Sequence, residues 1–252
     1  MKLLLENWRN YLKEGIRDGW DKSMNSGGSD SGAAQTGFEL DTGDITSLSD
    51  TVLGMFNRTD KIQIYCDMDG VLVDFEQGVV NQINSDLKML QGRGSPDKLI
   101  ALRDALEDLD RDYVTLDDLR GKSTAVEALR NYMYARVGDD EEFWANLPWM
   151  PNGKRLWDTI SHLEPKILTS PMAEGSRRGK QIWIENNLQP MPKEVLMSHE
   201  KYKWADENSI LIDDWSKNTV PWDEHGGTAI KHTDSQIDQT IQKLMELGAV
   251  EK

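Results

Sequence analysis

The sequence IQIYCDMDGVLVD at residues 62–74 decides the fold, because a short apolar run passes directly into a cluster of acidic residues. Residues 62–66 are β-prone and apolar, which is typical of a buried strand. Asp67 and Asp69 follow at once, and Gly70 permits a turn that would aim both carboxylates toward one crevice. Taken alone, this pair is as well explained by a solvated acidic turn.

Four further runs of the same texture predict additional strands, with helix-period segments between them, such as residues 153–163 and 176–187. They are residues 166–169, 194–197, 210–212 and 228–230. Strands that alternate with helices predict an α/β fold with a Rossmann-like parallel sheet covered on both faces. The residues between Asp74 and Thr169 contain no convincing strand, and apolar residues recur there every three or four positions, as at Leu99, Leu102, Leu106 and Leu109. We therefore predict a small helical cap inserted after the first strand.

The chain divides into four predicted parts. Residues 1–22 predict an amphipathic N-terminal helix, and residues 23–59 predict a flexible linker rich in Gly and Ser. Residues 60–77 and 150–252 form the predicted core, and residues 78–149 form the cap insert. The N-terminal helix either packs on its own domain or serves as a docking or processing tag for a protein partner.

Composition narrows the class of protein. The 252 residues are 38% hydrophobic, which is enough to bury a core. A formal net charge of -15 argues against a partner of duplex nucleic acid, which requires a basic surface. The single cysteine, Cys66, fits a reducing compartment, so we expect a cytoplasmic location, in the host cytoplasm if the protein is phage-encoded. We expect no membrane partner, because no apolar window suits a signal peptide or a membrane span.

A second acidic pair, Asp213 and Asp214, follows the apolar run at 210–212 and repeats the design of the first. The carboxyl ends of parallel strands share one edge of a sheet, so the two acidic clusters should meet there. Converging carboxylates repel one another unless a hard cation offsets their charge, and ligation by oxygen alone suits Mg²⁺.

Hydroxyl and lysine side chains supply the remaining candidate residues. Thr169 and Ser170 end the run at 166–169, where a hydroxyl can donate a hydrogen bond to a phosphate oxygen or simply close a turn. Lys201 and Lys203 precede the second acidic pair. A lysine at that edge would offset the charge of a phosphate and of the carboxylates, although lone lysines are usually solvated.

The first acidic cluster, the hydroxyl residues, the lysines and the second acidic pair follow one another along the chain. In this order they resemble the four motifs of the haloacid dehalogenase-like superfamily of phosphatases, over roughly residues 61–232. The resemblance is carried by DMDGVLVD at 67–74, Thr169, Lys201 or Lys203, and Asp213 with Asp214. A narrower resemblance is to the 5'(3')-deoxyribonucleotidase branch with its phage and bacterial relatives. It rests on DMDGVLVDFE at 67–76, FW at 143–144, LP at 147–148, PNG at 151–153, LTSP at 168–171 and LIDD at 211–214. The chain departs from that branch at WSKN, residues 215–218, where the branch often has Arg-Pro-Asp.

The resemblance implies a Mg²⁺-dependent phosphomonoester hydrolase, specifically a 5'-nucleotidase that acts on deoxyribonucleoside or ribonucleoside monophosphates. Asp67 would attack phosphorus and form an aspartyl-phosphate, and Asp69 would act first as acid and then as base. Thr169 and a lysine, Lys201 or Lys203, would hold the phosphate oxygens. Of the two lysines we prefer Lys201.

The resemblance also implies a ligand set for the metal. Asp67, the backbone carbonyl of Asp69, and Asp213 or Asp214 would bind Mg²⁺. We prefer Asp214 of the pair, and Asn218 resembles a residue that contacts metal-bound water in this superfamily.

The predicted substrate contacts are Phe75, Trp144 and Ser170. The two rings would form an aromatic wall for a base or a sugar, although packing of the insert against the sheet explains them equally well. Two other functions stay open at this point. One is a phosphatase for another small phosphate ester, such as a sugar phosphate, and the other is a non-catalytic binding protein on the same fold. The sequence gives no oligomeric state.

Overall fold

The structure is a computed structural model that describes residues 62–89, 97–120 and 124–251. The predicted N-terminal helix at 1–22 and the predicted linker at 23–59 lie outside the described residues. Among the described residues, no helix is both long enough and apolar enough to cross a membrane.

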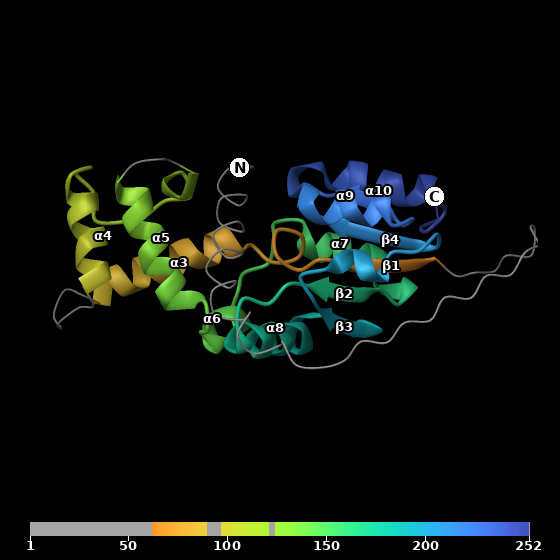
Figure 1. Cartoon of the computed structure of the whole chain (residues 1–252), viewed down its shortest axis with the longest axis horizontal. Helices are drawn as coiled ribbons and strands as arrows, with labels where there is room; N and C mark the ends of the chain where they lie inside the picture. The colour runs from red at the N-terminus through yellow and green to blue at the C-terminus, as the bar shows by residue number, and fades with distance from the viewer. Residues whose placement is uncertain (1–61, 90–96, 121–123, 252) are drawn as a thin grey trace, which may run out of the picture. The chain divides into compact units, whose positions relative to one another are not determined.

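Five parallel strands form one sheet in the order β3-β2-β1-β4-β5 (Figure 1). The strands are β1 Gln63–Cys66, β2 Lys166–Thr169, β3 Glu194–Met197, β4 Ser209–Asp213 and β5 Thr228–Lys231. Every strand predicted from the sequence is present, and the predicted Rossmann-like parallel sheet is confirmed. The strand order reverses direction at β1, and such a switch point is where open α/β sheets bind ligands outside the carboxyl ends of their strands.

The central strand is buried on both faces, which explains why its sequence is continuously apolar. Ile64 and Cys66 point to one face and Tyr65 to the other, and all three are buried. On the Tyr65 face, Leu168 and Leu211 from the neighbouring strands complete an apolar cluster. Trp222 covers this cluster with its ring centroid 5.1 Å from that of Tyr65. Helices therefore have to pack on both sides of the sheet.

Helices occupy the connections between the strands. The longer ones after the insert are α7 Gly153–Ile160, α8 Glu174–Asn187, α9 Ser216–Glu224 and α10 Ile237–Glu246, with short 3-10 turns η2 Ser161–Leu163, η3 Lys201–Trp204 and η4 Asp234–Gln236. The helix predicted over 153–163 is thus an α-helix that ends in a 3-10 turn. The helix predicted from residue 176 begins two residues earlier, at Glu174.

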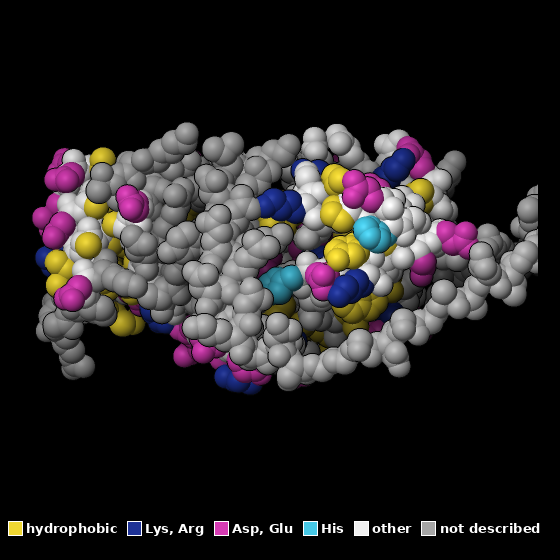
Figure 2. All heavy atoms as spheres, viewed as in Figure 1, with side chains coloured by type: hydrophobic (Ala, Val, Ile, Leu, Met, Phe, Trp, Pro, Cys, Tyr) yellow, Lys and Arg dark blue, Asp and Glu magenta, His cyan; other side chains and the backbone are white. Residues whose placement is uncertain are grey.

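The predicted helical insert lies between β1 and β2, and its described part contains no strand assigned to the sheet. It comprises α3 Phe75–Met89, α4 Asp97–Glu107, η1 Asp118–Arg120, α5 Thr124–Val137 and α6 Glu141–Ala145. Helix α4 buries Leu102 and Leu106 and exposes acidic residues, which are visible over its surface in Figure 2. Leu109 was predicted on the same helix, but it follows the helix end and is 44% exposed.

A polar network joins the helices of the insert. Asp86 of α3 accepts hydrogen bonds from the Tyr132 hydroxyl at 2.5 Å and from Arg136 Nε at 2.9 Å, both on α5. Arg136 also pairs with Asp140, the residue that caps the start of α6. Burial and the neighbouring Asp86 raise the pKa of Tyr132, so its hydroxyl stays a donor in this network.

The chain enters and leaves the insert side by side. Asp74 N–H donates to Pro148 O at 2.8 Å, and Met150 N–H donates to Leu72 O at 2.8 Å. Val73 and Trp149 form an antiparallel bridge between these two bonds. We call residues 72–74 with 148–150 the insert junction.

The junction leads directly into α3, and Asp74 caps that helix. Its Oδ1 accepts a hydrogen bond from Gln77 N–H at 2.9 Å, which satisfies one of the amide groups at the helix start that lack an intrahelical partner. We predict that Asp74→Ala lowers the free energy of unfolding by about 1 kcal/mol, because this cap is lost. Chemical denaturation with urea measures the change. Asp74→Asn is the control, since an asparagine oxygen can cap equally well, and equal losses in the two variants would contradict the capping role.

Candidate active site

Asp67 follows the carboxyl end of the central strand, where the sheet changes direction. Its backbone N–H donates to Ile212 O at 2.9 Å, which continues the pairing of β1 with β4 by one residue. Its side chain is almost fully buried, and Oδ1 accepts a hydrogen bond from Met68 N–H at 2.7 Å. The apolar strand therefore delivers a carboxylate to a fixed position at the switch point.

Lys201 lies between the first acid of each cluster. Its Nζ is 2.7 Å from Asp67 Oδ1 and 2.7 Å from Asp213 Oδ2, and the side chain is buried. Burial opposes the charge of this ammonium, but the carboxylates of Asp213 and Asp67 outweigh it and raise the pKa of Lys201. The two buried carboxylates therefore favour the charged form of this lysine.

The second acid pair is held from several sides. Asp213 Oδ2 also accepts a hydrogen bond from Asn218 Nδ2 at 2.8 Å, and Asp213 Oδ1 accepts one from Trp215 N–H at 2.8 Å. Asp214 approaches the turn after β1: a Cβ placed on Gly70 would lie 2.7 Å from Asp214 Oδ2. Gly70 has φ of 76°, so both its conformation and this contact require glycine.

The three carboxylates of Asp67, Asp213 and Asp214 form a group that could hold a cation. One oxygen from each lies within 4.8 Å of the other two. Three negative charges are brought together here, and Lys201 contributes one positive charge to the group. The excess of two negative charges and the purely oxygen donor set fit a divalent hard cation such as Mg²⁺. The convergence predicted from the sequence is therefore present, while the identity of the ion remains a prediction.

Asp69 reaches a different partner from Asp67. Its Oδ2 lies 2.5 Å from Nζ of Lys180, a fully buried lysine on α8. The same Nζ donates to Thr169 Oγ1 at 2.8 Å and to Ser170 O at 3.0 Å. Lys180 was not among the residues predicted from the sequence. A signal was present, because it is the one charged residue in the inward stripe formed with Ser176, Gly179, Trp183 and Ile184.

The other predicted polar residues divide into those near the acids and those elsewhere. Thr169 is fully buried and joins the acids through Lys180. Lys203 does not join them, because its side chain is 57% exposed and its Nζ pairs with Glu200 at 2.5 Å. The hydroxyl of Ser170 is engaged in the fold, donating to Ser198 O at 2.9 Å. The geometry thus separates Lys201 from Lys203, which spacing along the sequence did not.

The two aromatic residues predicted to contact substrate pack against each other. The rings of Phe75 and Trp144 are stacked at 5.1 Å, and Phe143 meets both edge-on. Trp144 is 1% exposed, and its indole N–H donates to Val137 O at 2.7 Å. These contacts correspond to the packing alternative, in which the rings fix the base of the insert. The predicted contact of these rings with a base or sugar stays a prediction.

Cys66 precedes the first acid but has no nucleophilic character. Burial, reinforced by the charge of Asp67, raises the pKa of its thiol well above the usual value. The buried thiol therefore stays protonated.

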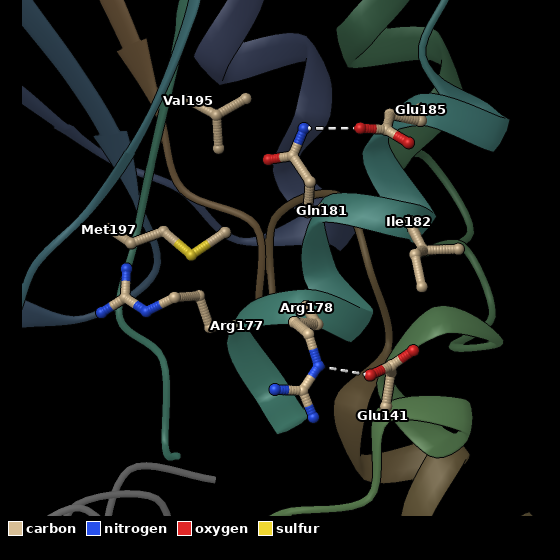
Figure 3. A pocket seen from close by; sticks show the side chains of 8 residues that line it. All are labelled: Glu141, Arg177, Arg178, Gln181, Ile182, Glu185, Val195 and Met197. Carbon is tan, nitrogen blue, oxygen red and sulfur yellow. Dashed lines mark hydrogen bonds and ion pairs between the residues drawn. The ribbon is translucent and has the colours of Figure 1, made fainter. Parts of the chain in front are cut away.

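A surface hollow of about 530 Å³ lies on the outer face of α8 (Figure 3), and Asp67, Asp213 and Asp214 do not line it. Its walls include Arg177, Arg178 and Gln181 from the helix and Val195 and Met197 from β3. Figure 3 shows Arg178 turned toward Glu141 and Gln181 toward Glu185, pairs that close part of the rim. The hollow contains none of the residues predicted for the site.

The chain was compared with protein-family models, with curated proteins and with solved structures. The chain matches no protein-family model and no curated protein. Solved structures with a similar arrangement include a HAD-superfamily hydrolase from Ehrlichia chaffeensis, with 14% identity, coverage of 73% of this chain and 98% of that one, and a TM-score of 0.44. A hydrolase from Streptococcus pneumoniae TIGR4 has 11% identity, coverage of 72% and 98%, and a TM-score of 0.41. L-2-haloacid dehalogenase from Xanthobacter autotrophicus has 16% identity, coverage of 67% and 76%, and a TM-score of 0.39.

The carboxylate group leads to a prediction about metal binding. Mg²⁺ added to metal-free protein should raise the midpoint of thermal unfolding, because an ion bound only by the folded state stabilises it by about 2.7 kcal/mol at a hundredfold excess over Kd. Asp214→Asn should abolish most of this shift by removing one of the three carboxylates. Asp238→Asn, which changes an exposed aspartate on α10, should leave the shift intact. Equal Mg²⁺ shifts in Asp214→Asn and the unmodified protein would exclude a site at these residues.

Proposed function

We propose that the protein is a Mg²⁺-dependent phosphomonoester hydrolase of the haloacid dehalogenase-like type, which acts through an aspartyl-phosphate on Asp67. The observation that supports this most is the convergence of Asp67, Asp213 and Asp214, with Lys201 bridging the first two. Such a group can bind a cation and a phosphoryl group together, since the cation and the lysine both offset the phosphate charge. The four sequence motifs of the superfamily thus supply the side chains found at one edge of the sheet.

In the proposed reaction, a carboxylate oxygen of Asp67 attacks phosphorus, and the bond from phosphorus to the ester oxygen breaks. Asp69, in its carboxylic acid form, gives its proton to the departing oxygen, so the alcohol leaves neutral and Asp69 becomes a carboxylate. Asp69 then takes a proton from water, which attacks phosphorus and releases inorganic phosphate and the free Asp67 carboxylate. Two moderate barriers replace one high barrier.

The surrounding residues hold charge in place during both steps. Lys201 keeps the Asp67 carboxylate oriented through Oδ1, and it faces the negative charge that develops on the phosphoryl oxygens. Magnesium, when bound by Asp67, Asp213 and Asp214, would offset the charge of the phosphoryl group against that of the nucleophile. We propose that the backbone carbonyl of Asp69 is a further ligand and that Asn218 contacts metal-bound water, as the resemblance implies.

We propose a nucleoside 5'-monophosphate as substrate. The support is the sequence DMDGVLVDFE at 67–76 and the motifs that follow it, which resemble the 5'(3')-deoxyribonucleotidase branch. The net charge of -15 fits a small phosphate ester rather than duplex nucleic acid as the partner, and the single cysteine fits a cytoplasmic location.

The nucleophile can be tested without knowledge of the natural substrate. Hydrolysis of 4-nitrophenyl phosphate with Mg²⁺ should fall by roughly 10⁶-fold in Asp67→Asn, the scale on which removal of a nucleophile acts in another enzyme that forms a covalent intermediate. Asp238→Asn is the matched control and should hydrolyse the ester at the unmodified rate. Undiminished hydrolysis in Asp67→Asn would mean that another group attacks phosphorus.

The substrate class needs a separate measurement. Deoxyribonucleoside and ribonucleoside 5'-monophosphates should show a kcat/KM at least about tenfold higher than sugar phosphates, because contacts with the base and sugar contribute binding energy in the transition state. Release of inorganic phosphate across a panel of both classes measures this ratio. Faster turnover of the sugar phosphates would replace the nucleotidase assignment while leaving the phosphatase chemistry in place.

A further inference from the structure

Lys180 is a buried ammonium that the proposed reaction has not used so far. It lies on the inward face of α8 with no exposed surface, and its Nζ is 5.0 Å from the centre of the Trp144 ring. Figure 3 shows the opposite, outer face of this helix, which carries Arg177, Arg178 and Gln181. A lysine pays a large desolvation cost in such a place unless its donors are all satisfied, so its retention there requires an explanation.

The three donors of this ammonium are fully used. They go to Asp69 Oδ2 at 2.5 Å, Thr169 Oγ1 at 2.8 Å and Ser170 O at 3.0 Å. Lys180 therefore has no donor left for a phosphate oxygen unless it gives up one of these bonds. It differs in this respect from Lys201, whose partners are Asp67 and Asp213.

The bond to Asp69 makes its two carboxylate oxygens unequal. Oδ2 is held by Lys180, whereas Oδ1 is buried and has no hydrogen-bond partner among the described residues. A buried oxygen without a partner is costly, which is typical of a position that is completed only when a ligand arrives. Oδ1 is therefore the oxygen available to exchange a proton with the ester oxygen.

The bond to Thr169 has a similar effect on its hydroxyl. Because Oγ1 accepts the N–H of Lys180, the hydroxyl hydrogen has to point away from Nζ. Thr169 ends β2 next to the central strand, so its hydroxyl can donate toward a phosphoryl group at the switch point. One lysine thus orients two groups, one in the turn after β1 and one at the end of β2.

We propose that Lys180 is a positioning residue for leaving-group departure: it fixes Asp69 through Oδ2, leaves Oδ1 for proton transfer, and directs the Thr169 hydroxyl. The proposal rests on the proposed function, since it assigns a role within that reaction. It predicts a defect that depends on the leaving group. An alkoxide needs a proton in order to leave, whereas 4-nitrophenolate leaves without one.

The test compares kcat/KM for two esters, a simple alkyl phosphate and 4-nitrophenyl phosphate, both with Mg²⁺. This constant covers the steps up to departure of the leaving group and excludes the later hydrolysis of the aspartyl-phosphate. In Lys180→Met, kcat/KM should fall about 100-fold for the alkyl ester and less than about tenfold for the aryl ester, the difference being the contribution of a positioned acid. Lys243→Met, which changes an exposed lysine on α10, should leave both constants unchanged.

Two further variants secure the interpretation. Lys180→Arg keeps the charge and the donors and should restore most of the alkyl-to-aryl ratio, whereas Lys180→Gln loses the charge and carries the same prediction as Lys180→Met should that variant fail to fold. In an Asp69→Asn background, Lys180→Met should cause no further change in the ratio, because the two residues act as one unit.

The outcomes separate the two proposals. Equal losses for both esters in the neutral variants would show that Lys180 only supports the fold, and the positioning role would be wrong while the phosphatase assignment stood. No turnover of either ester by the unmodified protein would overturn the proposed function itself.

Discussion

The structure depends on one buried charge, the ammonium of Lys201 between the carboxylates of Asp67 and Asp213. Two apolar strands end in acids at the same edge of the sheet, and the acids could not be buried together without a cation between them. Removing one partner from a buried ion pair of this kind typically costs about 3 to 5 kcal/mol, because the remaining charge loses its compensation. The burial of Asp67 and Asp213 at the ends of two paired strands therefore depends on η3, which supplies this lysine.

The fold could be predicted from the sequence because its strands are short, apolar and followed by acids or hydroxyls. Residues 62–66 and 210–212 each carry this signature, and both are strands in the structure. The convergence of Asp67 with the pair Asp213 and Asp214 followed from parallel pairing alone, since the carboxyl ends of parallel strands share an edge. The helical character of the insert followed from apolar periodicity, with an error at Leu109, where the helix had already ended.

Other parts of the site depend on side-chain direction, which spacing does not give. Lys201 and Lys203 lie two residues apart on a 3-10 turn, so one points into the site and the other into solvent. Phe75 and Trp144 carry the same sequence signal whether they stack on a ligand or on each other, and the structure shows the second arrangement. Lys180 escaped prediction because a lysine within a helix normally lies on the solvent face, and only the burial of its neighbours on α8 reveals the exception.

The insert junction allows the insert to vary in length and sequence independently of the sheet. Leu72 and Met150 are joined by a backbone hydrogen bond, so the ends of the insert are held together by the core rather than by the insert's own helices. The entropy of closing a chain between fixed ends grows slowly with length, by only about 0.6 kcal/mol for each doubling. Inserts of other lengths and sequences can therefore be exchanged at this point without shifting the strand register, so that the insert can change while the acids and lysines at the sheet edge stay the same.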